Sequence, residues 1–224
     1  MREILIADDH PLFRDALKRA LAQAVPDALL FDADSVAALQ VLVEAHTDAE
    51  LLLLDLHMPG ATGFSTLAYL RGQHPGLPVV VVSAQEDPGV IRRAIAHGAS
   101  GYIPKSASVD TIVTAVRRIL DGEVWLPPYL SGNAGALDAD EASVASRIAE
   151  LTPQQFRVLG MIASGLLNKQ IAFELNVSEA TIKAHMTAIM RKLHVSNRTQ
   201  VALVANHLAL EQNANAPQSA ESSG

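Results

Sequence analysis

Two runs of residues without a single polar side chain constrain the fold of this chain more than any other feature. Residues 51–54 are all Leu and residues 79–82 are all Val, a pattern typical of parallel strands that are buried on both faces. Further apolar runs at 4–7, 28–31 and 101–103 have the length of additional strands. The sequence therefore predicts a parallel sheet in the first half of the chain.

Segments of helical periodicity separate these runs. Between the runs at 4–7 and 28–31, apolar residues recur at spacings of three and four residues, which predicts a helix. By the same pattern, helices are expected at residues 11–25, 35–45, 64–72, 87–97 and 109–120. Five β/α repeats within about 120 residues predict a fold of the α/β class, a doubly wound five-stranded parallel sheet with helices on both faces.

The amino-acid composition of the chain changes after residue 127. Pro127 and Pro128 are followed by Ser, Gly and Asn residues at 131–135, which are typical of a linker. Residues 152–210 read as short helices, and the residues after them are rich in Asn, Gln and Ser. We therefore expect a first domain at 1–127, a linker at 128–149 whose acidic end can hold a short helix, a small all-α domain at 150–211 and a disordered tail at 212–224.

The composition excludes several classes of function. The chain contains no Cys, which excludes disulfides, thiolate metal sites, iron–sulfur clusters and cysteine nucleophiles. Its apolar runs are too short to cross a bilayer, and it starts Met-Arg-Glu without the pattern of a signal peptide. The expected location is the cytoplasm, without contact with a membrane.

Charge is distributed unevenly along the chain. The net charge of −7 arises mainly from residues 1–127, which carry 16 acidic against 10 basic residues. Residues 151–212 instead carry 6 basic against 3 acidic residues. An anionic partner such as nucleic acid is therefore expected on the second half.

Polar residues follow four of the five predicted strands, at the point where each strand ends. Asp8 and Asp9 follow the first strand, Asp55 the third, Ser83 the fourth and Lys105 the fifth. Because the carboxyl ends of parallel strands meet at one edge of the sheet, these side chains should converge there. Each residue alone is compatible with a helix cap or a turn, but the full set indicates a site.

Three carboxylates at one edge repel one another and require a cation. Oxygen ligands alone favour a hard ion, and Mg²⁺ in particular where a phosphate is the substrate. Asp55 is then placed to act as a nucleophile that forms an aspartyl-phosphate, with the Lys and the Ser of the set on the phosphoryl oxygens. The side chains of His10 and His57 are not expected to bind the metal, and Asp32, after the second strand, has no evident partner.

The motifs that carry these residues resemble the receiver domain of two-component response regulators. They are DDHP at 8–11, LDLHMPG at 54–60, VSA at 82–84 and GASGYIPK at 98–105. The resemblance implies a flavodoxin-like sheet with the strand order 2-1-3-4-5. One departure is Ser83, where the family more often has Thr, but Ser supplies the same hydroxyl group.

The resemblance also implies a role for each residue of the site. Asp55 is the phosphoacceptor, and Asp9 and Asp55 ligate Mg²⁺ directly. Asp8 acts in the second shell of the metal or through water, and the backbone carbonyl of His57 completes the protein ligands. The remaining implied roles are those of Lys105 and Ser83 as partners of the phosphoryl group and of Tyr102 as the switch aromatic whose rotamer follows Ser83.

A helix-turn-helix pattern dominates the second half. Residues 168–175 form a predicted short helix, residues 176–178 a tight turn and residues 178–193 a longer helix for which Ser178 is the N-cap. One stripe of the longer helix is apolar, at Ile182, Met186, Ile189 and Leu193. The opposite stripe is small, polar or basic, which suits insertion into a major groove, and comprises Ala180, Lys183, Ala184, Thr187 and Arg191.

This segment resembles the LuxR-type DNA-binding domain over residues 150–211. The matching motifs are LTPQQFRVL at 151–159, NKQIA at 168–172, VSEATIKAH at 177–185 and RKLHV at 191–195. Gln154 and Gln155 depart from the family, which usually has Arg-Glu there, so an ion pair at that helix end is expected to be missing.

Contacts with DNA are assigned by position on these helices. Base-edge contacts are expected from Lys183, Ala184 and Thr187. Contacts with the DNA backbone are expected from Asn168, Lys169, Ser178, Thr181, Arg191 and Lys192. His185 is assigned to the edge of the core. A last helix at 198–210 is apolar nearly all round, and in the family its spare face is the dimer contact.

The two resemblances together imply a response regulator of the NarL/FixJ class. Such a protein is a transcription regulator that a histidine kinase phosphorylates, here on Asp55, and that dimerises on an inverted repeat in double-stranded DNA. RNA polymerase is a further candidate partner, and the chain is not expected to be an enzyme. Two modes of activation stay open: the receiver either masks the DNA-reading helix before phosphorylation or serves as an assembly platform.

Two other functions are weighed against this one. A receiver that acts mainly as a phosphate sink or docking module, with weak DNA binding, would suit the small positive charge of residues 151–212. A phosphatase with an Asp nucleophile would need a second Asp two residues after Asp55, where the chain has His57. Neither a P-loop nor a Gly-x-Gly-x-x-Gly motif follows the first strand.

Overall fold

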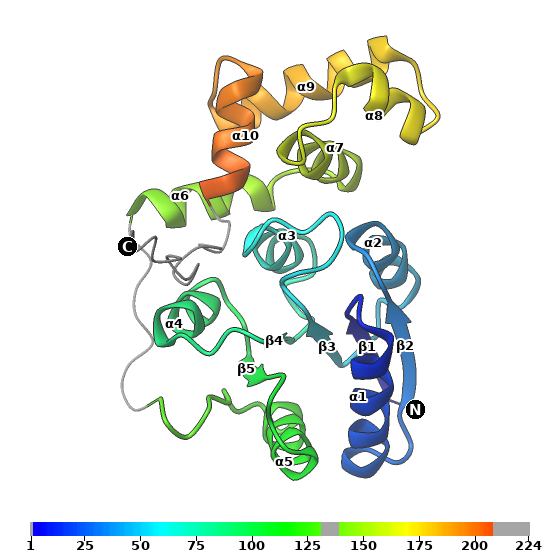
Figure 1. Ribbon diagram of the computed structural model, residues 1–224, viewed down its shortest axis with the longest axis vertical. Helices are drawn as coiled ribbons and strands as arrows, with labels where there is room; N and C mark the ends of the chain where they lie inside the picture. Colours follow the sequence, from blue (N-terminus) through cyan, green and yellow to red (C-terminus); the bar gives the residue numbers. More distant parts are fainter. Residues whose placement is uncertain (1, 131–138, 208–224) are drawn as a thin grey trace, which may run out of the picture.

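The structure is a computed structural model that describes residues 2–130 and 139–207. The predicted tail at 212–224, the end of the last predicted helix and residues 131–135 of the predicted linker lie outside these residues. Figure 1 shows an α/β domain formed by the first half of the chain and a helical domain formed by the second half.

The α/β domain contains a five-stranded parallel sheet with the order β2-β1-β3-β4-β5. The strands are β1 (Glu3–Ala7), β2 (Leu29–Ala33), β3 (Leu51–Leu54), β4 (Val79–Ser83) and β5 (Gly101–Pro104). β1 pairs in parallel with both β2 and β3, and Ile4 lies opposite Leu51. The predicted fold class and strand order are confirmed.

Burial on both faces explains the apolar runs of the central strands. Alternate residues point to opposite sides of the sheet, so Leu51 and Leu53 pack in one hydrophobic cluster and Leu52 and Leu54 in another. The first cluster lies under α1 (Pro11–Ala24) and α5 (Val109–Leu120). The second lies under α2 (Val36–Ala45), α3 (Ser65–Gln73) and α4 (Pro88–Ala96) (Figure 1).

Side chains at the starts of three helices explain where these helices begin. Ser35 and Ser108 cap α2 and α5 by accepting a hydrogen bond from a backbone N–H group three residues later. Asp87 caps α4 by accepting from the N–H groups of Gly89 and Val90. A cap of this kind stabilises a helix by about 1 kcal/mol, and it is encoded locally, which is why the predicted starts lie close to the observed ones.

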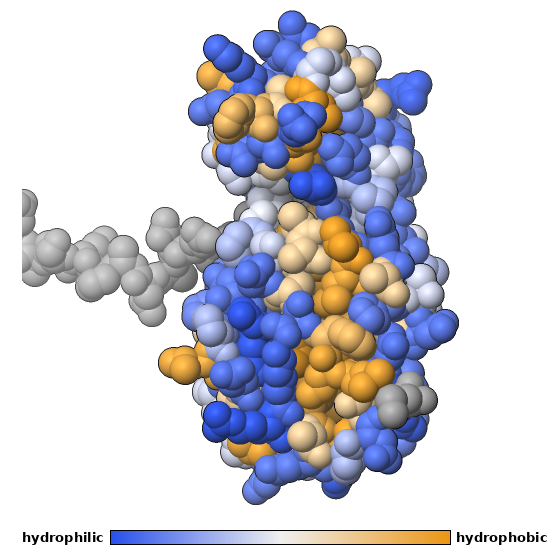
Figure 2. Space-filling model, turned by 90° about the vertical axis from the view of Figure 1, so that its right-hand side faces the viewer, coloured by the Kyte–Doolittle hydropathy of each residue, from blue (hydrophilic) through white to orange (hydrophobic). Residues whose placement is uncertain are grey.

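β2 is an edge strand of the sheet and has a single strand neighbour in the described structure. Figure 2 views the side of the molecule that carries α1, α2 and β2, and it shows a band of apolar surface along the α/β domain. The exposed large apolar side chains of these three elements are Leu12, Leu29 and Val41. The sheet therefore ends in an apolar surface on this side.

The helical domain contains the predicted helix-turn-helix. Its helices are α6 (Ala139–Ala149), α7 (Pro153–Ala163), α8 (Asn168–Glu174), α9 (Glu179–Leu193) and α10 (Arg198–His207). The turn before α9 contains Asn176 with a left-handed φ of 51°, and Ser178 caps α9 by accepting from the N–H group of Thr181. The predicted apolar stripe of α9 is buried, at Ile182, Met186, Ile189 and Leu193.

α6 lies within the segment predicted as a linker, and it packs against both domains. It contacts α3 of the α/β domain and α9 and α10 of the helical domain. Gln73 of α3 donates a hydrogen bond of 2.7 Å to the carbonyl oxygen of Ala149, and Arg147 donates one of 3.2 Å to the carbonyl oxygen of Leu193. The second half of the linker is therefore a helix that bridges the two domains.

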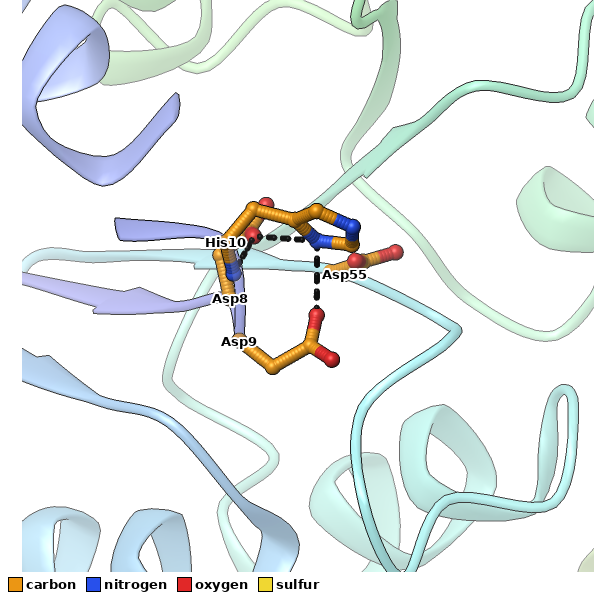
Figure 3. Close-up of side chains that lie close together, drawn as sticks. All are labelled: Asp8, Asp9, His10 and Asp55. Atoms are coloured by element: carbon orange, nitrogen blue, oxygen red, sulfur yellow. Dashed lines mark hydrogen bonds and ion pairs between the residues drawn. The ribbon is translucent and has the colours of Figure 1, made fainter. Parts of the chain in front are cut away.

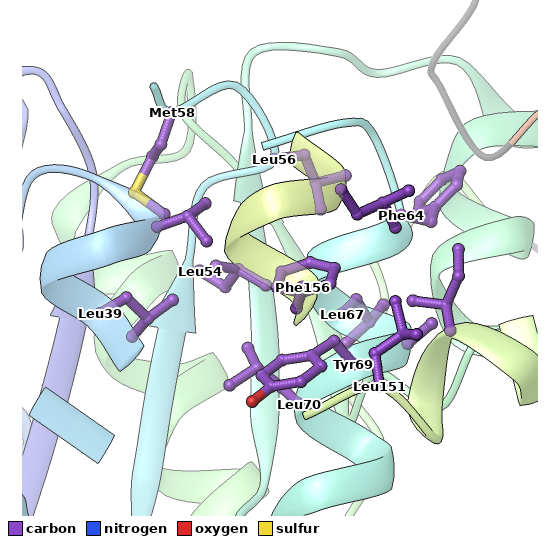
Figure 4. Packing of buried hydrophobic residues seen from close by; sticks show 14 of the residues in the cluster. Leu39, Leu54, Leu56, Met58, Phe64, Leu67, Tyr69, Leu70, Leu151 and Phe156 are labelled. Carbon is purple, nitrogen blue, oxygen red and sulfur yellow. The ribbon is translucent and has the colours of Figure 1, made fainter. Parts of the chain in front are cut away.

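The two domains share a hydrophobic interface. Tyr69 of α3 and Phe156 of α7 stack with ring centroids 4.2 Å apart and an interplanar angle of 7°. Both lie in one hydrophobic cluster with Leu67 and Leu151 (Figure 4). A stacked aromatic pair contributes about 0.5–1.5 kcal/mol beyond the burial of its area. The hydrophobic core is therefore continuous from one domain to the other.

Glycine residues allow close backbone contacts at this interface. A Cβ atom on Gly160 of α7 would lie 3.0 Å from the carbonyl oxygen of Gly60, in the loop after β3. A Cβ atom on Gly72 of α3 would lie 2.4 Å from the Cβ atom of Ala149. The contact between α3 and α6 therefore requires a residue without a side chain at position 72.

Candidate functional site

Three charged residues predicted from the strand ends meet at the carboxyl edge of the sheet. Asp8 and Asp55 follow β1 and β3, and their side chains are each 1% exposed. The ammonium group of Lys105, which follows β5, lies 2.7 Å from Asp8 Oδ2 and 2.8 Å from Asp55 Oδ2. The sheet topology thus brings together side chains that are up to 97 positions apart in the sequence.

Asp9 and His10 lie beside Asp8 and Asp55 and complete an acidic cluster with them (Figure 3). Nδ1 of His10 lies 2.7 Å from Asp9 Oδ1 and 3.3 Å from Asp8 Oδ1. Ligand atoms of Asp8, Asp9, His10 and Asp55 all lie within 4.8 Å of one another. The imidazole of His10, which is not expected from the sequence to bind the metal, thus lies against two of the carboxylates.

Asp55 is held in its ionised form. Burial raises the pKa of its carboxyl group, but hydrogen bonds from His57 and Lys105 outweigh burial and hold the pKa below its usual value. The backbone N–H group of His57 donates one of these bonds, at 3.0 Å. Burial also lowers the pKa of Lys105, and the bonds to Asp55 and Asp8 outweigh it and raise this pKa. Both partners therefore carry their charges.

The acidic cluster has the features of a cation site. The Asp8 Oδ2 and Asp9 Oδ1 atoms are both buried. Their nearest polar neighbours are the ammonium group of Lys105 and the imidazole of His10. One ammonium group therefore faces two buried carboxylates, Asp8 and Asp55. Buried negative charge is costly unless it is compensated, so the donor set fits a divalent ion that prefers oxygen ligands.

Ser83 and Tyr102 lie side by side behind the carboxylates, and both side chains are fully buried. Ser83 Oγ accepts a hydrogen bond of 3.2 Å from the N–H group of Gln85, and the Tyr102 hydroxyl donates one of 2.6 Å to the carbonyl oxygen of Gln85. Burial raises the pKa of the Tyr102 hydroxyl to about 12. The ring of Tyr102 therefore lies in the interior of the domain, and its hydroxyl is bonded to the loop after β4.

A pocket gives access to Asp55 from solvent. It has a volume of about 360 Å³ and is lined by His10, Leu12, Phe13, Asp55, His57, Ala84 and Lys105. A cavity of this size is sufficient for a phosphoryl group on a small donor or on a side chain of a partner protein.

Asp32 lies apart from the site and has partners of its own. Its carboxylate lies 3.1 Å from Nε of Arg14 and 2.6 Å from Nζ of Lys18. The expectation that Asp32 lacks a partner is wrong, because residues of α1 that face β2 cannot be recognised from sequence neighbours alone.

The predicted DNA-reading side of α9 is exposed. Lys183, Ala184, Thr187 and Arg191 are exposed on this helix, and the elements in contact with α9 are α6, α7, α8 and α10. Lys169 and Ser178 are also exposed, while Asn168, Thr181, Lys192 and His185 are half-buried. The contacts between the domains thus leave this side of α9 free.

Two predicted contacts with the DNA backbone are engaged within the domain. Nζ of Lys192 donates hydrogen bonds to the carbonyl oxygen of Glu150, at 2.8 Å, and to Gln155 Oε1, at 2.9 Å. Asn168 Oδ1 accepts a hydrogen bond of 2.9 Å from Arg198, which the sequence analysis does not single out. Gln155 thus offers Lys192 a neutral acceptor at the helix end where the resemblance predicts that the family's ion pair is missing. It also completes the capping box of α7 with Thr152.

The comparisons with known proteins match both halves of the chain. Residues 4–117 match the family described as response regulator receiver domain, and residues 149–205 match the luxR family of bacterial regulatory proteins. The glycerol metabolism activator of Pseudomonas putida is 39% identical over 213 residues, with 93% of this chain and 96% of that protein covered. The nitrate/nitrite response regulator NarL of Escherichia coli is 32% identical over 201 residues, with 89% and 93% covered.

A solved structure of similar fold is that of RcsB from Salmonella enterica serovar Typhimurium bound to a promoter in the presence of the phosphomimetic BeF₃⁻. It has a TM-score of 0.54 and 23% sequence identity, and the match covers 93% of this chain and 99% of that chain. At this identity, the likeness supports the fold of the chain.

The fold, the acidic cluster and the helix-turn-helix define a protein that joins a receiver to a DNA-binding domain. The chain belongs to the family of two-component response regulators with a LuxR-type DNA-binding domain, the family of transcription regulators that includes NarL. Among the residues described, no helix combines the length and the apolar character needed to cross a membrane.

Proposed function

We propose that Asp55 is the phosphoacceptor of this response regulator and that a histidine kinase supplies the phosphoryl group. The observation that carries the proposal is the buried contact of Asp55 with Lys105, together with Asp8 on the same ammonium group. An ionised carboxylate at the floor of an open pocket is placed to attack phosphorus. The bond from phosphorus to the donor nitrogen breaks as the bond to Asp55 forms.

The residues around Asp55 stabilise the phosphoryl group in this proposal. The Lys105 ammonium group would move from the carboxylate to a phosphoryl oxygen, and the Ser83 hydroxyl would donate to another. Asp9 and Asp55, with Asp8 through water or in the second shell and the backbone carbonyl of His57, would hold Mg²⁺. Bound Mg²⁺ would neutralise charge on the phosphoryl oxygens.

α9 is proposed to read an inverted repeat in double-stranded DNA. Lys183, Ala184 and Thr187 would contact base edges, because they share one exposed side of the helix. The DNA backbone would be contacted by Asn168, Lys169, Ser178, Thr181 and Arg191; a contact from Lys192 would compete with its bonds to Glu150 and Gln155. The exposed Leu203 of α10 supports a homodimer contact on that helix.

Lys183→Ala tests the base contact. Affinity for the specific site should fall by about 1–3 kcal/mol, and discrimination against random DNA should relax. Lys169→Ala is the matched control, since a phosphate contact should weaken binding to specific and random DNA alike. Fluorescence anisotropy with both DNAs at one salt concentration measures this, and a uniform loss for Lys183→Ala would make it a phosphate contact.

Because the DNA-reading side of α9 is exposed, activation by assembly is favoured over masking. We expect a fragment of residues 139–224, which keeps α6 on α9, to bind target DNA about as tightly as the unphosphorylated full chain. Phosphorylation should raise affinity mainly through dimerisation. A DNA titration of the three species with light scattering measures this, and a fragment that binds far more tightly than the full chain would restore masking.

The alternatives give different results in the same experiments. A phosphate sink would be phosphorylated without a gain in DNA affinity, and a phosphatase would turn over phosphomonoesters. We propose that the chain is no enzyme in this sense and that it acts in the cytoplasm, where a kinase and chromosomal DNA meet. RNA polymerase is a further candidate partner once the dimer is bound.

A further inference from the structure

The imidazole of His10 has no part in the phosphotransfer proposed above, yet it lies in the acidic site (Figure 3). Its Nδ1 atom is within 2.7 Å of Asp9 Oδ1 and 3.3 Å of Asp8 Oδ1. These distances are short enough for one ion to contact the nitrogen and the carboxylates together, since all four candidate ligand atoms lie within 4.8 Å of one another.

The backbone holds His10 at this position. Its N–H group donates a hydrogen bond of 2.8 Å to Asp8 Oδ1, and its carbonyl oxygen accepts from the N–H groups of Phe13 and Arg14. Pro11 keeps the preceding residue extended, at φ −91° and ψ 105°. The ring is 64% exposed, so a small rotation brings its nitrogen to a metal without disturbing buried atoms.

We propose that His10 Nδ1 is a ligand for divalent transition-metal ions at this site. The site would then take Ni²⁺ or Cu²⁺ with nitrogen and oxygen ligands, besides Mg²⁺ with oxygen ligands alone. Imidazole nitrogen suits these transition metals, whereas Mg²⁺ retains oxygen ligands and water. The inference rests on the proposed function, because it concerns the same acidic cluster, and it makes His10 the residue that determines metal preference.

His57 is the alternative source of a nitrogen ligand, and it lies farther away. Its Nδ1 atom is 3.8 Å from Asp55 Oδ1, against 2.7 Å between His10 and Asp9. Its side chain is 33% exposed. Both histidines are therefore accessible, and replacing each one by Gln allows their effects on metal binding to be compared.

The test is a calorimetric titration of the untagged full chain with Ni²⁺ and with Mg²⁺ at a pH where imidazole is neutral. His10→Gln should lower Ni²⁺ affinity by at least the ~10-fold that is typical for groups supporting a metal ligand, and it should change Mg²⁺ affinity much less. His46→Gln is the matched control, since the His46 imidazole pairs with Glu3 outside the acidic cluster, and it should leave the ratio of the two affinities near that of the wild type. Pulsed electron paramagnetic resonance of the Cu²⁺ form should show a nitrogen coupling that His10→Gln removes.

An unchanged affinity ratio in His10→Gln, or a nitrogen coupling that only His57→Gln removes, would overturn the assignment. Asp55→Asn separates this outcome from failure of the proposed function. It should weaken both metals, because it removes a shared carboxylate; if it weakens neither, the acidic cluster itself is not the metal site.

Discussion

Asp55→Asn is expected to abolish phosphorylation of the chain by a small phosphodonor in the presence of Mg²⁺ and to leave the fold intact. The amide keeps the volume of the side chain and an acceptor for the N–H group of His57, but it is no nucleophile. Lys105 would not be left unpaired, because Asp8 Oδ2 lies 2.7 Å from its ammonium group. Intact-mass spectrometry measures the phosphorylated fraction, and circular dichroism checks the fold.

Asp32→Asn is the matched control for this prediction. Asp32 is an Asp near the end of β2, another strand of the same sheet, but it pairs with Arg14 and Lys18 outside the acidic cluster. We expect this variant to be phosphorylated like the wild type. Phosphorylation of Asp55→Asn to the wild-type level would place the acceptor on another residue, and an equal loss in both variants would indicate damage to the whole domain.

Gly72→Ala is expected to destabilise the full chain and to separate the domains, although Ala is the better helix former. Local propensity alone would predict a gain of about 1 kcal/mol inside α3. The added Cβ atom would instead lie 2.4 Å from Ala149 Cβ and 2.7 Å from the Ala149 carbonyl oxygen. Overpacking of this kind costs about 1–3 kcal/mol, so we expect a net loss in denaturant titrations and a larger radius of gyration in X-ray scattering.

Gly76→Ala is the control for the interface. A Cβ atom on Gly76, just after α3, would meet nothing within 4 Å, so this variant should match the wild type in stability and in scattering. If Gly72→Ala proves as stable as the wild type with unchanged scattering, the contact between α3 and α6 is not kept in solution.

The strands and helices of the α/β domain could be predicted from the sequence because each one is encoded locally. The run at Leu51–Leu54 is apolar on both faces of its strand, and the strand is buried on both faces. The cap at Ser35 and the proline at the start of α1 mark helix starts directly. The predicted and observed bounds of these elements agree to within two residues.

The contacts that join distant elements were beyond this kind of prediction. Asp32 meets Arg14 and Lys18 only after β2 has paired with β1 and α1 has packed on the sheet. The bond from Lys192 to Gln155 depends on how α9 crosses α7. The placement of His10 against Asp8 and Asp9 depends on side-chain geometry within a turn, for which a composition pattern contains no information.

The site residues also fall into two groups, those whose position follows from the sequence and those whose position depends on tertiary contacts. Asp8, Asp55 and Lys105 converge as the strand ends require, so the topology rule for parallel sheets was sufficient to find them. The position of the Tyr102 ring does not follow from the strand ends, since its packing depends on the loop after β4, where the Gln85 carbonyl oxygen accepts a hydrogen bond from the Tyr102 hydroxyl.

The two glycine contacts between the domains limit how freely such chains can exchange parts. Receivers and DNA-binding domains are often pictured as interchangeable modules, but here a Cβ atom on Gly72 would lie 2.4 Å from Ala149 Cβ, and one on Gly160 would lie 3.0 Å from the Gly60 carbonyl oxygen. A hybrid that joins this receiver to the DNA-binding domain of a relative would keep the close arrangement only if the incoming domain carried equally small residues at both places. Recombination between relatives would therefore preserve such pairs of small residues together, and their joint presence in another chain would mark the same arrangement of domains.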